Sequence, residues 1–218
     1  MKGIQGVHQP CLARALFAIA MLCLPLVANA QALSGIRVLP SVDREYPFPG
    51  WKHEGVVPTS LAVPLELGDE IYGATLQLQP ANAGETYRVR VQLETSLALG
   101  AEGPHLDLID WKHCTSAWLP ADAVDAVTFI VPKPTPDQQG CFPTYTRQEL
   151  DAAVRAHAVR QGDPTIADGW LSDLDKGGEA RAVSPYVAIS TVRVRVEALR
   201  KGTWVVVTTL AFQPLMGC

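Results

Sequence analysis

The chain has 218 residues, of which 48% are hydrophobic and 18% are charged, and its formal net charge is −4. A chain of this length buries a substantial core in one domain or in two small ones. The acidic balance gives no overall attraction to nucleic acid or to anionic lipid, and no basic run is longer than Arg200-Lys201. We therefore do not expect a nucleic-acid partner.

Residues 1–30 have the pattern of a secretory signal peptide. Lys2 and Arg14 precede an apolar run that ends in Ala28-Asn-Ala30, with small residues at the two positions that a signal peptidase reads. The run is shorter than the about 20 apolar residues of a comfortable membrane span. We predict cleavage after Ala30, a periplasmic or secreted location, and a mature chain without a transmembrane span.

Two of the five cysteines leave with this segment. A lipoprotein anchored at Cys23 is an alternative, but Leu22 before it is not the small residue that lipid attachment usually requires. In an oxidising compartment we expect a disulfide between Cys114 and Cys141, because it would close an irregular, proline-rich connection. Cys218 is the last residue and stays free or replaces either partner.

Alternation of apolar and polar residues predicts about eight short strands in the mature chain, because a period of two places successive side chains on opposite faces of a sheet. The predicted strands are residues 31–40, 61–67, 71–79, 86–94, 105–111, 124–131, 186–199 and 203–212. Pro64 cannot donate to a neighbouring strand and so predicts a sheet edge. Residues 97–104 contain glycine and are predicted as a connection.

The closing hairpin is the strongest structural signal. In its first arm Val192, Val194 and Val196 alternate with charged residues, which predicts one buried face. The second arm, residues 203–212, is rich in β-branched residues and nearly all apolar, as a strand covered on both faces would be. Lys201-Gly202 predicts the tight turn between the arms, because glycine accepts a positive φ.

Helix is predicted only at about 147–161 and 165–174. Thr146 and Glu149 have the spacing of a capping box, and Leu150 and Val154 lie on one apolar stripe. The predicted fold is therefore mainly β: an antiparallel β-sandwich or distorted barrel of about eight strands with one or two helices packed on it. Residues 31–218 are expected to form a single β-rich globular domain.

Aromatic residues accompany prolines in residues 43–53, where Tyr46, Phe48 and Trp51 are candidate binding residues. These rings either pack on the body of the domain or form a ledge that meets a ligand or partner. We favour packing.

Two Arg-Val-Arg rows, residues 88–90 and 193–195, are predicted to point outward. If their strands are neighbours, four guanidinium groups share a face and could bind carboxylates or phosphates. If they are not, Glu94 and Glu197 are ordinary cross-strand partners for the arginines. We favour the second interpretation.

Three residues form a candidate metal or acid–base pattern: His105, Asp107 and His113. Imidazole and carboxylate at this spacing suit zinc. The same pattern is typical of the solvated face of a strand whose other face holds Leu106 and Leu108, and we favour that interpretation, with no metal and no cofactor. Residues 173–178 begin like a calcium loop but lack its later ligands, so we expect an acidic turn.

No catalytic residue is assigned, and there is no Gly-x-Ser-x-Gly motif. Long loops on a strand scaffold favour an exported binding module, such as an inhibitor or immunity-type protein that binds another protein. One alternative is a metal- or carboxylate-dependent hydrolase near His105, Asp107 and His113. Another is a structural component of the cell envelope, which would self-associate; the sequence does not predict the oligomeric state.

Overall fold

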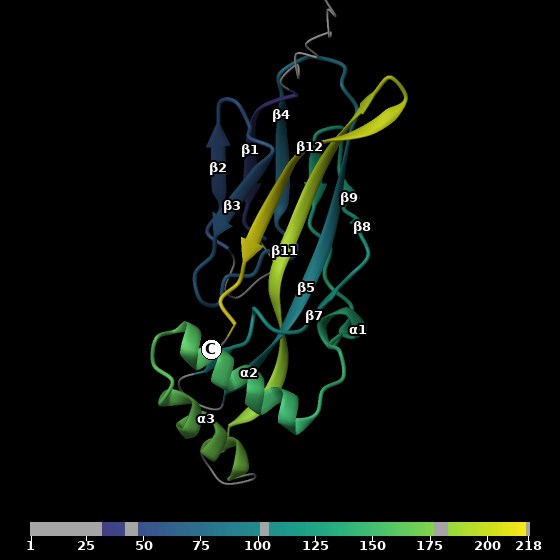
Figure 1. Ribbon diagram of the computed structural model, residues 1–218. Coiled ribbons are helices and arrows are strands. Elements are labelled where there is room, and N and C mark those ends of the chain that lie inside the picture. The colour runs from purple at the N-terminus through teal and green to yellow at the C-terminus, as the bar shows by residue number, and fades with distance from the viewer. Residues whose placement is uncertain (1–31, 42–47, 101–104, 177–182, 217–218) are drawn as a thin grey trace, which may run out of the picture. The chain divides into compact units, whose positions relative to one another are not determined.

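The computed structural model describes residues 32–41, 48–100, 105–176 and 183–216. Its strands form two sheets, and three helices accompany them (Figure 1). The predicted mainly β fold of sandwich type is thereby confirmed. The signal peptide, Tyr46 and Cys218 lie outside the described residues, so cleavage after Ala30 and export stay predictions. No helix in the described ranges has the length and apolar character needed to cross a membrane.

The first sheet has five strands in the order β2-β1-β4-β10-β9, and all its pairs are antiparallel. Its strands are β1 (Leu33–Leu39), β2 (Trp51–Glu54), β4 (Thr75–Pro80), β9 (Asp122–Ala123) and β10 (Thr128–Ile130). β2 and β9, which the sequence pattern did not predict as strands, are its two edges.

The second sheet has seven strands in the order β3-β12-β11-β5-β6, and β7 and β8 also pair with β5. Its strands are β3 (Ser60–Pro64), β5 (Tyr87–Gly100), β6 (Leu106–Asp107), β7 (His113–Thr115), β8 (Leu119–Pro120), β11 (Ser184–Arg200) and β12 (Thr203–Gln213). β3 is an edge strand, as Pro64 predicted, although it runs parallel to β12.

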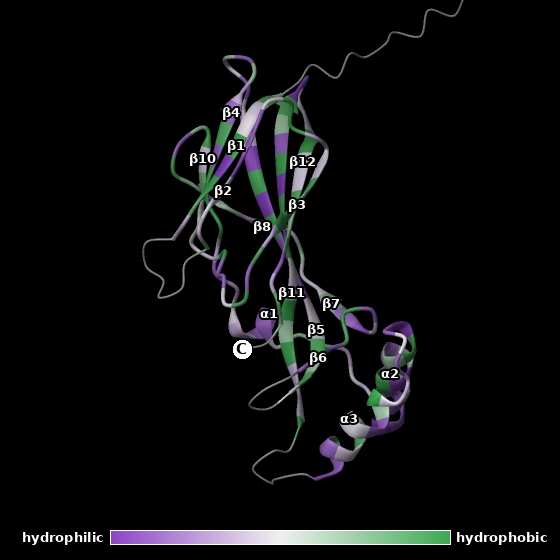
Figure 2. Cartoon of the chain, turned by 90° about the vertical axis from the view of Figure 1, so that its left-hand side faces the viewer, coloured by the Kyte–Doolittle hydropathy of each residue, from purple (hydrophilic) through white to green (hydrophobic). Residues whose placement is uncertain are grey.

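The two sheets share one apolar core. Val192, Val194 and Val196 are at most 1% exposed and pack in one cluster with residues of β1 and β4 such as Ile36 and Leu76. The alternation predicted for the first arm of the hairpin is therefore confirmed. Figure 2 shows hydrophobic and hydrophilic residues alternating along the strands of both sheets.

The second arm of the hairpin differs from the prediction near its turn. Val205 is 40% exposed and Val206 is 45% exposed, so this part of β12 is not covered on both faces. The reason is that β3 pairs with β12 only from Thr209 onward. The turn itself is confirmed, since Lys201 and Gly202 have φ values of 50° and 78°.

β5 and β11 are longer than predicted and extend into a second core under the helices. The predicted connection 97–104 is wrong at its start, because β5 continues to Gly100 and buries Leu97 and Leu99 against α2 and α3 (Figure 1). The helices are α1 (Pro136–Gln139), α2 (Arg147–Arg160) and α3 (Ile166–Asp175). The two predicted helices are thus confirmed, with the capping box of Thr146 and Glu149, and α1 was missed.

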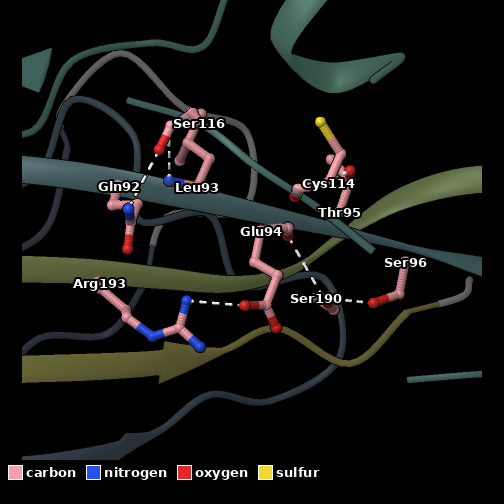
Figure 3. A network of polar contacts seen from close by, with 9 residues as sticks. All are labelled: Gln92, Leu93, Glu94, Thr95, Ser96, Cys114, Ser116, Ser190 and Arg193. Carbon is pink, nitrogen blue, oxygen red and sulfur yellow. Dashed lines mark hydrogen bonds and ion pairs between the residues drawn. The ribbon is translucent and has the colours of Figure 1, made fainter. Parts of the chain in front are cut away.

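β11 has a β-bulge at Ser190, close to the point where the strand passes from the first core to the second. The register between β11 and β5 shifts between Ile189 and Thr191, which leaves Ser190 as the extra residue. Its hydroxyl lies 2.8 Å from the buried Ser96 hydroxyl and also donates to the Glu94 carbonyl (Figure 3). These hydrogen bonds satisfy the polar groups that the bulge buries.

The predicted disulfide joins Cys114 on β7 to Cys141 after α1, with 5.8 Å between the two Cα atoms. Thr95 of β5 donates a hydrogen bond to the Cys141 carbonyl. The disulfide therefore ties the connection that follows α1 to the middle of the second sheet, beside the bulge.

Candidate binding site

A shallow groove lies where β1 ends and β2 begins. It is lined by Val38, Leu39, Pro40, Pro49 and Trp51, together with Arg37, Gly50 and Lys52. Leu39 is 39% exposed, and both prolines are exposed as well. The groove is therefore an apolar surface with two basic side chains beside it.

Gly50 sets the geometry of the groove. It has a φ of +98°, and a Cβ there would lie 3.3 Å from the Val38 carbonyl oxygen. Glycine is required because it accepts this backbone conformation and this close approach. The chain can then turn into β2 and place Trp51 opposite Val38 of β1.

The His53 ring stacks on the ring of Trp51. The two rings stack at an interplanar angle of 21° with their centroids 6.2 Å apart. The His53 Nε2 atom lies 3.0 Å from the Val56 carbonyl oxygen, which fixes the imidazole in turn. The indole is therefore a half-buried ring with restrained orientation, the kind of side chain that loses little entropy when it meets a ligand.

β2 also provides an open sheet edge next to the groove. Among the described residues it pairs only with β1. The Gly55 amide donates to the Ser34 carbonyl (2.9 Å), so the backbone groups of Gly55 and His53 face β1. Because strand residues alternate, the backbone N–H and C=O groups of Lys52 and Glu54 face away from the sheet. They can pair with an extended segment of another chain.

The three aromatic residues singled out in the sequence have different surroundings. Phe48 is 2% exposed and packs edge-on against Phe212, so it belongs to the core. Trp51 is only half-buried and lines the groove. Tyr46 lies outside the described residues. Phe48 is therefore a core residue, whereas Trp51 packs against the same core and also lines the groove.

Sequence reasoning missed the other residues of the groove. Leu39, Pro40 and Pro49 come together only because β2 folds back on β1. The alternation Trp51-Lys-His-Glu54 is the signal that would have predicted β2 and, with it, this contact.

The residues proposed as a metal or acid–base site are only partly brought together. The Nε2 atom of His105 lies 3.7 Å from the Oδ2 atom of Asp107. His113 lies on a different strand, β7, opposite Ser96, and is exposed. In the described part of the chain no three His, Cys, Asp or Glu side chains are grouped so that they could hold a metal ion.

A cleft beside the bulge contains further charged groups, of which sequence reasoning connected Asp110 with Asp107 but missed Glu94 and Arg193. It is lined by Glu94, Asp107, Asp110, Ser190 and Arg193, among others. The Glu94 carboxylate accepts a hydrogen bond of 2.8 Å from Arg193 (Figure 3). The charge of Glu94 is therefore already neutralised within the protein.

Burial perturbs two groups at this end of the molecule. Desolvation raises the pKa of Asp107, although His105 and His157 oppose the shift. Desolvation lowers the pKa of His157, and the charge of Arg160 adds to this effect. Buried groups with shifted pKa values occur both in active sites and in packed structural positions.

The Arg-Val-Arg rows lie on neighbouring strands, and Glu94 and Glu197 are nevertheless their partners. Arg88 donates a 2.6 Å hydrogen bond to Glu197, and Arg193 pairs with Glu94. Arg195 lies 3.9 Å above the Trp118 ring. The favoured premise that the two strands are not neighbours is wrong, but Arg88, Arg193 and Arg195 do lie within 4 Å of Glu197 or Glu94, and Arg90 donates to the Trp118 carbonyl instead.

No family model matches the chain, and no curated protein or solved structure was found to be similar to it. The fold and the site together define a two-sheet β domain with helices at one end and an apolar groove beside a sheet edge.

Proposed function

We propose that this chain is an exported binding module that holds a partner protein in the groove of β1 and β2. The observation that carries the proposal is the combination of an exposed apolar surface, formed by Leu39, Pro40, Pro49 and Trp51, with the open edge of β2. An apolar surface supplies burial, and an open edge supplies hydrogen bonds in a fixed direction. This combination suits an extended protein segment better than a compact small molecule.

The chemistry of the groove narrows the partner segment. Its apolar and proline-rich floor favours apolar or proline residues in an extended conformation, which aromatic-lined grooves bind. Arg37 and Lys52 line the same groove, so an acidic residue in the segment would add electrostatic attraction. An inhibitor or immunity-type role is compatible with this mode, because such proteins act by occupying another protein.

The proposal is tested by capture from a periplasmic extract or culture supernatant at physiological salt. The bait is the mature wild-type chain, and the matched bait carries Trp51→Ala. We expect a stoichiometric partner on the wild-type bait that is depleted on the variant. A partner that both baits retain equally would contradict the site, and the lack of any stoichiometric partner would contradict the function.

The hydrolase alternative rests on one observation, the proximity of His105 and Asp107 in a region where desolvation raises the pKa of the carboxyl group. Its test is His105→Ala. If the purified chain hydrolyses an ester, peptide or glycoside substrate, the alternative requires that this variant lose the activity. Unchanged activity would remove the His105 site.

A further inference from the structure

The part of β12 next to the hairpin turn is an open sheet edge of unusual composition. Residues 203–207 read Thr-Trp-Val-Val-Val and contain no charge and no proline. Within the described residues only β11 pairs with residues 203–206, Val207 is the extra residue of a β-bulge, and β3 joins β12 from Thr209 onward. These residues belong to the yellow hairpin at the top of Figure 1.

The other edges of the second sheet carry features that discourage pairing with another chain. β3 ends in Pro64, and β6 has only two residues, including Asp107. Charges, prolines and short length are the usual protections of an edge strand. Residues 203–206 have none of them, although the bulge at Val207 follows directly, so this short edge is open to pairing with another chain.

The backbone groups that face the open side can be identified. The Leu199 amide donates to the Thr86 carbonyl of the segment before β5 (2.9 Å), so the backbone groups of Leu199 face away from β12. Because these groups alternate in direction along a strand, the backbone N–H and C=O groups of Ala198 and Arg200 face β12. Their partners in the register are Val205 and Thr203, whose groups therefore face β11. The N–H and C=O groups of Trp204 and Val206 are left on the open side.

We propose that a second copy of this chain covers this edge, with the two β12 strands antiparallel about a two-fold axis at Val205. This register sets Trp204 of each copy opposite Val206 of the other, so the open groups of both residues pair in both copies. A two-fold axis at Val206 would bring Thr203 opposite Thr209, where β3 already pairs. An axis at Trp204 would bring Val206 opposite the turn residue Gly202. Only the axis at Val205 uses the whole open segment and nothing beyond it.

The side chains fit the same arrangement. At a two-fold axis a residue meets its own copy, so a charged residue there would be repelled. The residue at this axis is Val205, which is 40% exposed and uncharged. Val206, which is 45% exposed, would lie beside the Trp204 ring of the other copy, and this ring is backed by Arg88 at 4.4 Å. Arg88, which lies beside Trp204, and Glu197, which lies opposite Val206, are already paired with each other within each copy, and Arg200 lies 3.6 Å from Glu85.

The contact is small, since each copy contributes a five-residue edge where a standard interface has about 20–30 residues a side. We therefore expect a reversible equilibrium between monomer and dimer. Sedimentation velocity of the mature chain between about 10 µM and about 1 mM is the measurement. The weight-average mass should rise with concentration toward twice the monomer mass.

Charge variants at the axis provide the decisive comparison. Val205→Lys and Val205→Glu are each expected to stay monomeric, whereas their equimolar mixture is expected to associate at least as strongly as wild type. Val159→Lys, at a 64% exposed position of α2, is the matched control and should associate like wild type. If the wild-type chain is monomeric over the whole concentration range, the inference that a second copy covers the edge is overturned. Persistent dimers of Val205→Lys would overturn the register.

Cross-linking tests the axis without a charge change. Directly opposed residues of an antiparallel pair have Cβ atoms about 4.5–5.5 Å apart, which is close enough for a disulfide after a small adjustment. Val205→Cys should therefore give a covalent dimer on mild oxidation. Thr203→Cys, two residues along the same strand, should not, and equal cross-linking of both variants would contradict the axis.

Discussion

Replacing Glu197 by glutamine tests how the outer face of the second sheet is stabilised. Glu197 is 5% exposed although it is charged. Its carboxylate accepts a 2.6 Å hydrogen bond from Arg88 and lies 3.5 Å from the Nε atom of Arg195. Glutamine has the same shape but no charge, so both guanidinium groups would lose their counter-charge without the formation of a cavity.

The expected loss of stability follows from how exposed the two arginine partners of Glu197 are. Breaking a fully buried ion pair costs about 3–5 kcal/mol, because a buried charge is left without a partner. The Arg88 side chain is 39% exposed and that of Arg195 is 22% exposed, so water recovers part of this cost. We expect Glu197→Gln to lower the free energy of unfolding by about 2 kcal/mol, which corresponds to a fall in Tm of about 6 °C for a domain of this size.

Urea unfolding of disulfide-intact protein at pH 7 measures this loss. Glu54→Gln is the matched control, since the Lys52–Glu54 pair has side chains that are 67% and 60% exposed. Its effect should be at most about 0.5 kcal/mol, as for other exposed pairs. If the two variants lose equal stability, the argument that burial makes the Glu197 contacts strong is refuted.

Two further predictions concern the helical end and the disulfide. Because burial lowers the pKa of His157, the unfolded chain binds a proton near pH about 6.5 that the folded chain does not bind until lower pH. The free energy of unfolding should therefore fall as the pH drops below about 6.5. Unfolding curves of His157→Leu across this pH range should show a smaller fall. If the variant and the wild type lose the same free energy, other groups cause the effect. The Cys114–Cys141 bond closes a loop with a sequence separation of 27, so the paired variant Cys114→Ser with Cys141→Ser should lose about 3.5 kcal/mol in the chain-entropy model. Urea unfolding measures this loss as well, and a change below about 1 kcal/mol would show that the connection is held without the bond.

Local periodicity was sufficient to predict the long elements. Val192, Val194 and Val196 alternate because one sheet face is buried, and Thr146 with Glu149 begins a helix by hydrogen bonds within four residues. These signals arise from residues close together in the chain, so they can be predicted from the sequence. Proline and glycine also predicted correctly where their backbone limits decide, at the Pro64 edge and the Gly202 turn.

The features that were missed depend on contacts distant in sequence. β5 continues past residue 94 because Leu97 and Leu99 meet helices that begin some fifty residues later, which no window around residue 97 contains. The exposure of Val205 depends on where β3 stops pairing. The groove likewise exists only because Trp51 returns to lie opposite Val38. An apolar residue in a strand shows a tendency to be buried, but the neighbouring element decides whether it is buried.

The most direct test of the binding function is the affinity of the captured partner for groove variants. Leu39→Ser and Trp51→Ala change the groove, and Leu67→Ser, at a leucine that is 51% exposed outside it, is the control. Titration by calorimetry should show binding weakened at least about 30-fold by Trp51→Ala, as for an aromatic hot spot worth about 2 kcal/mol, and less strongly by Leu39→Ser. Leu67→Ser should bind like wild type. Equal affinity of the wild-type, Leu39→Ser and Trp51→Ala chains would contradict the groove as the site of recognition.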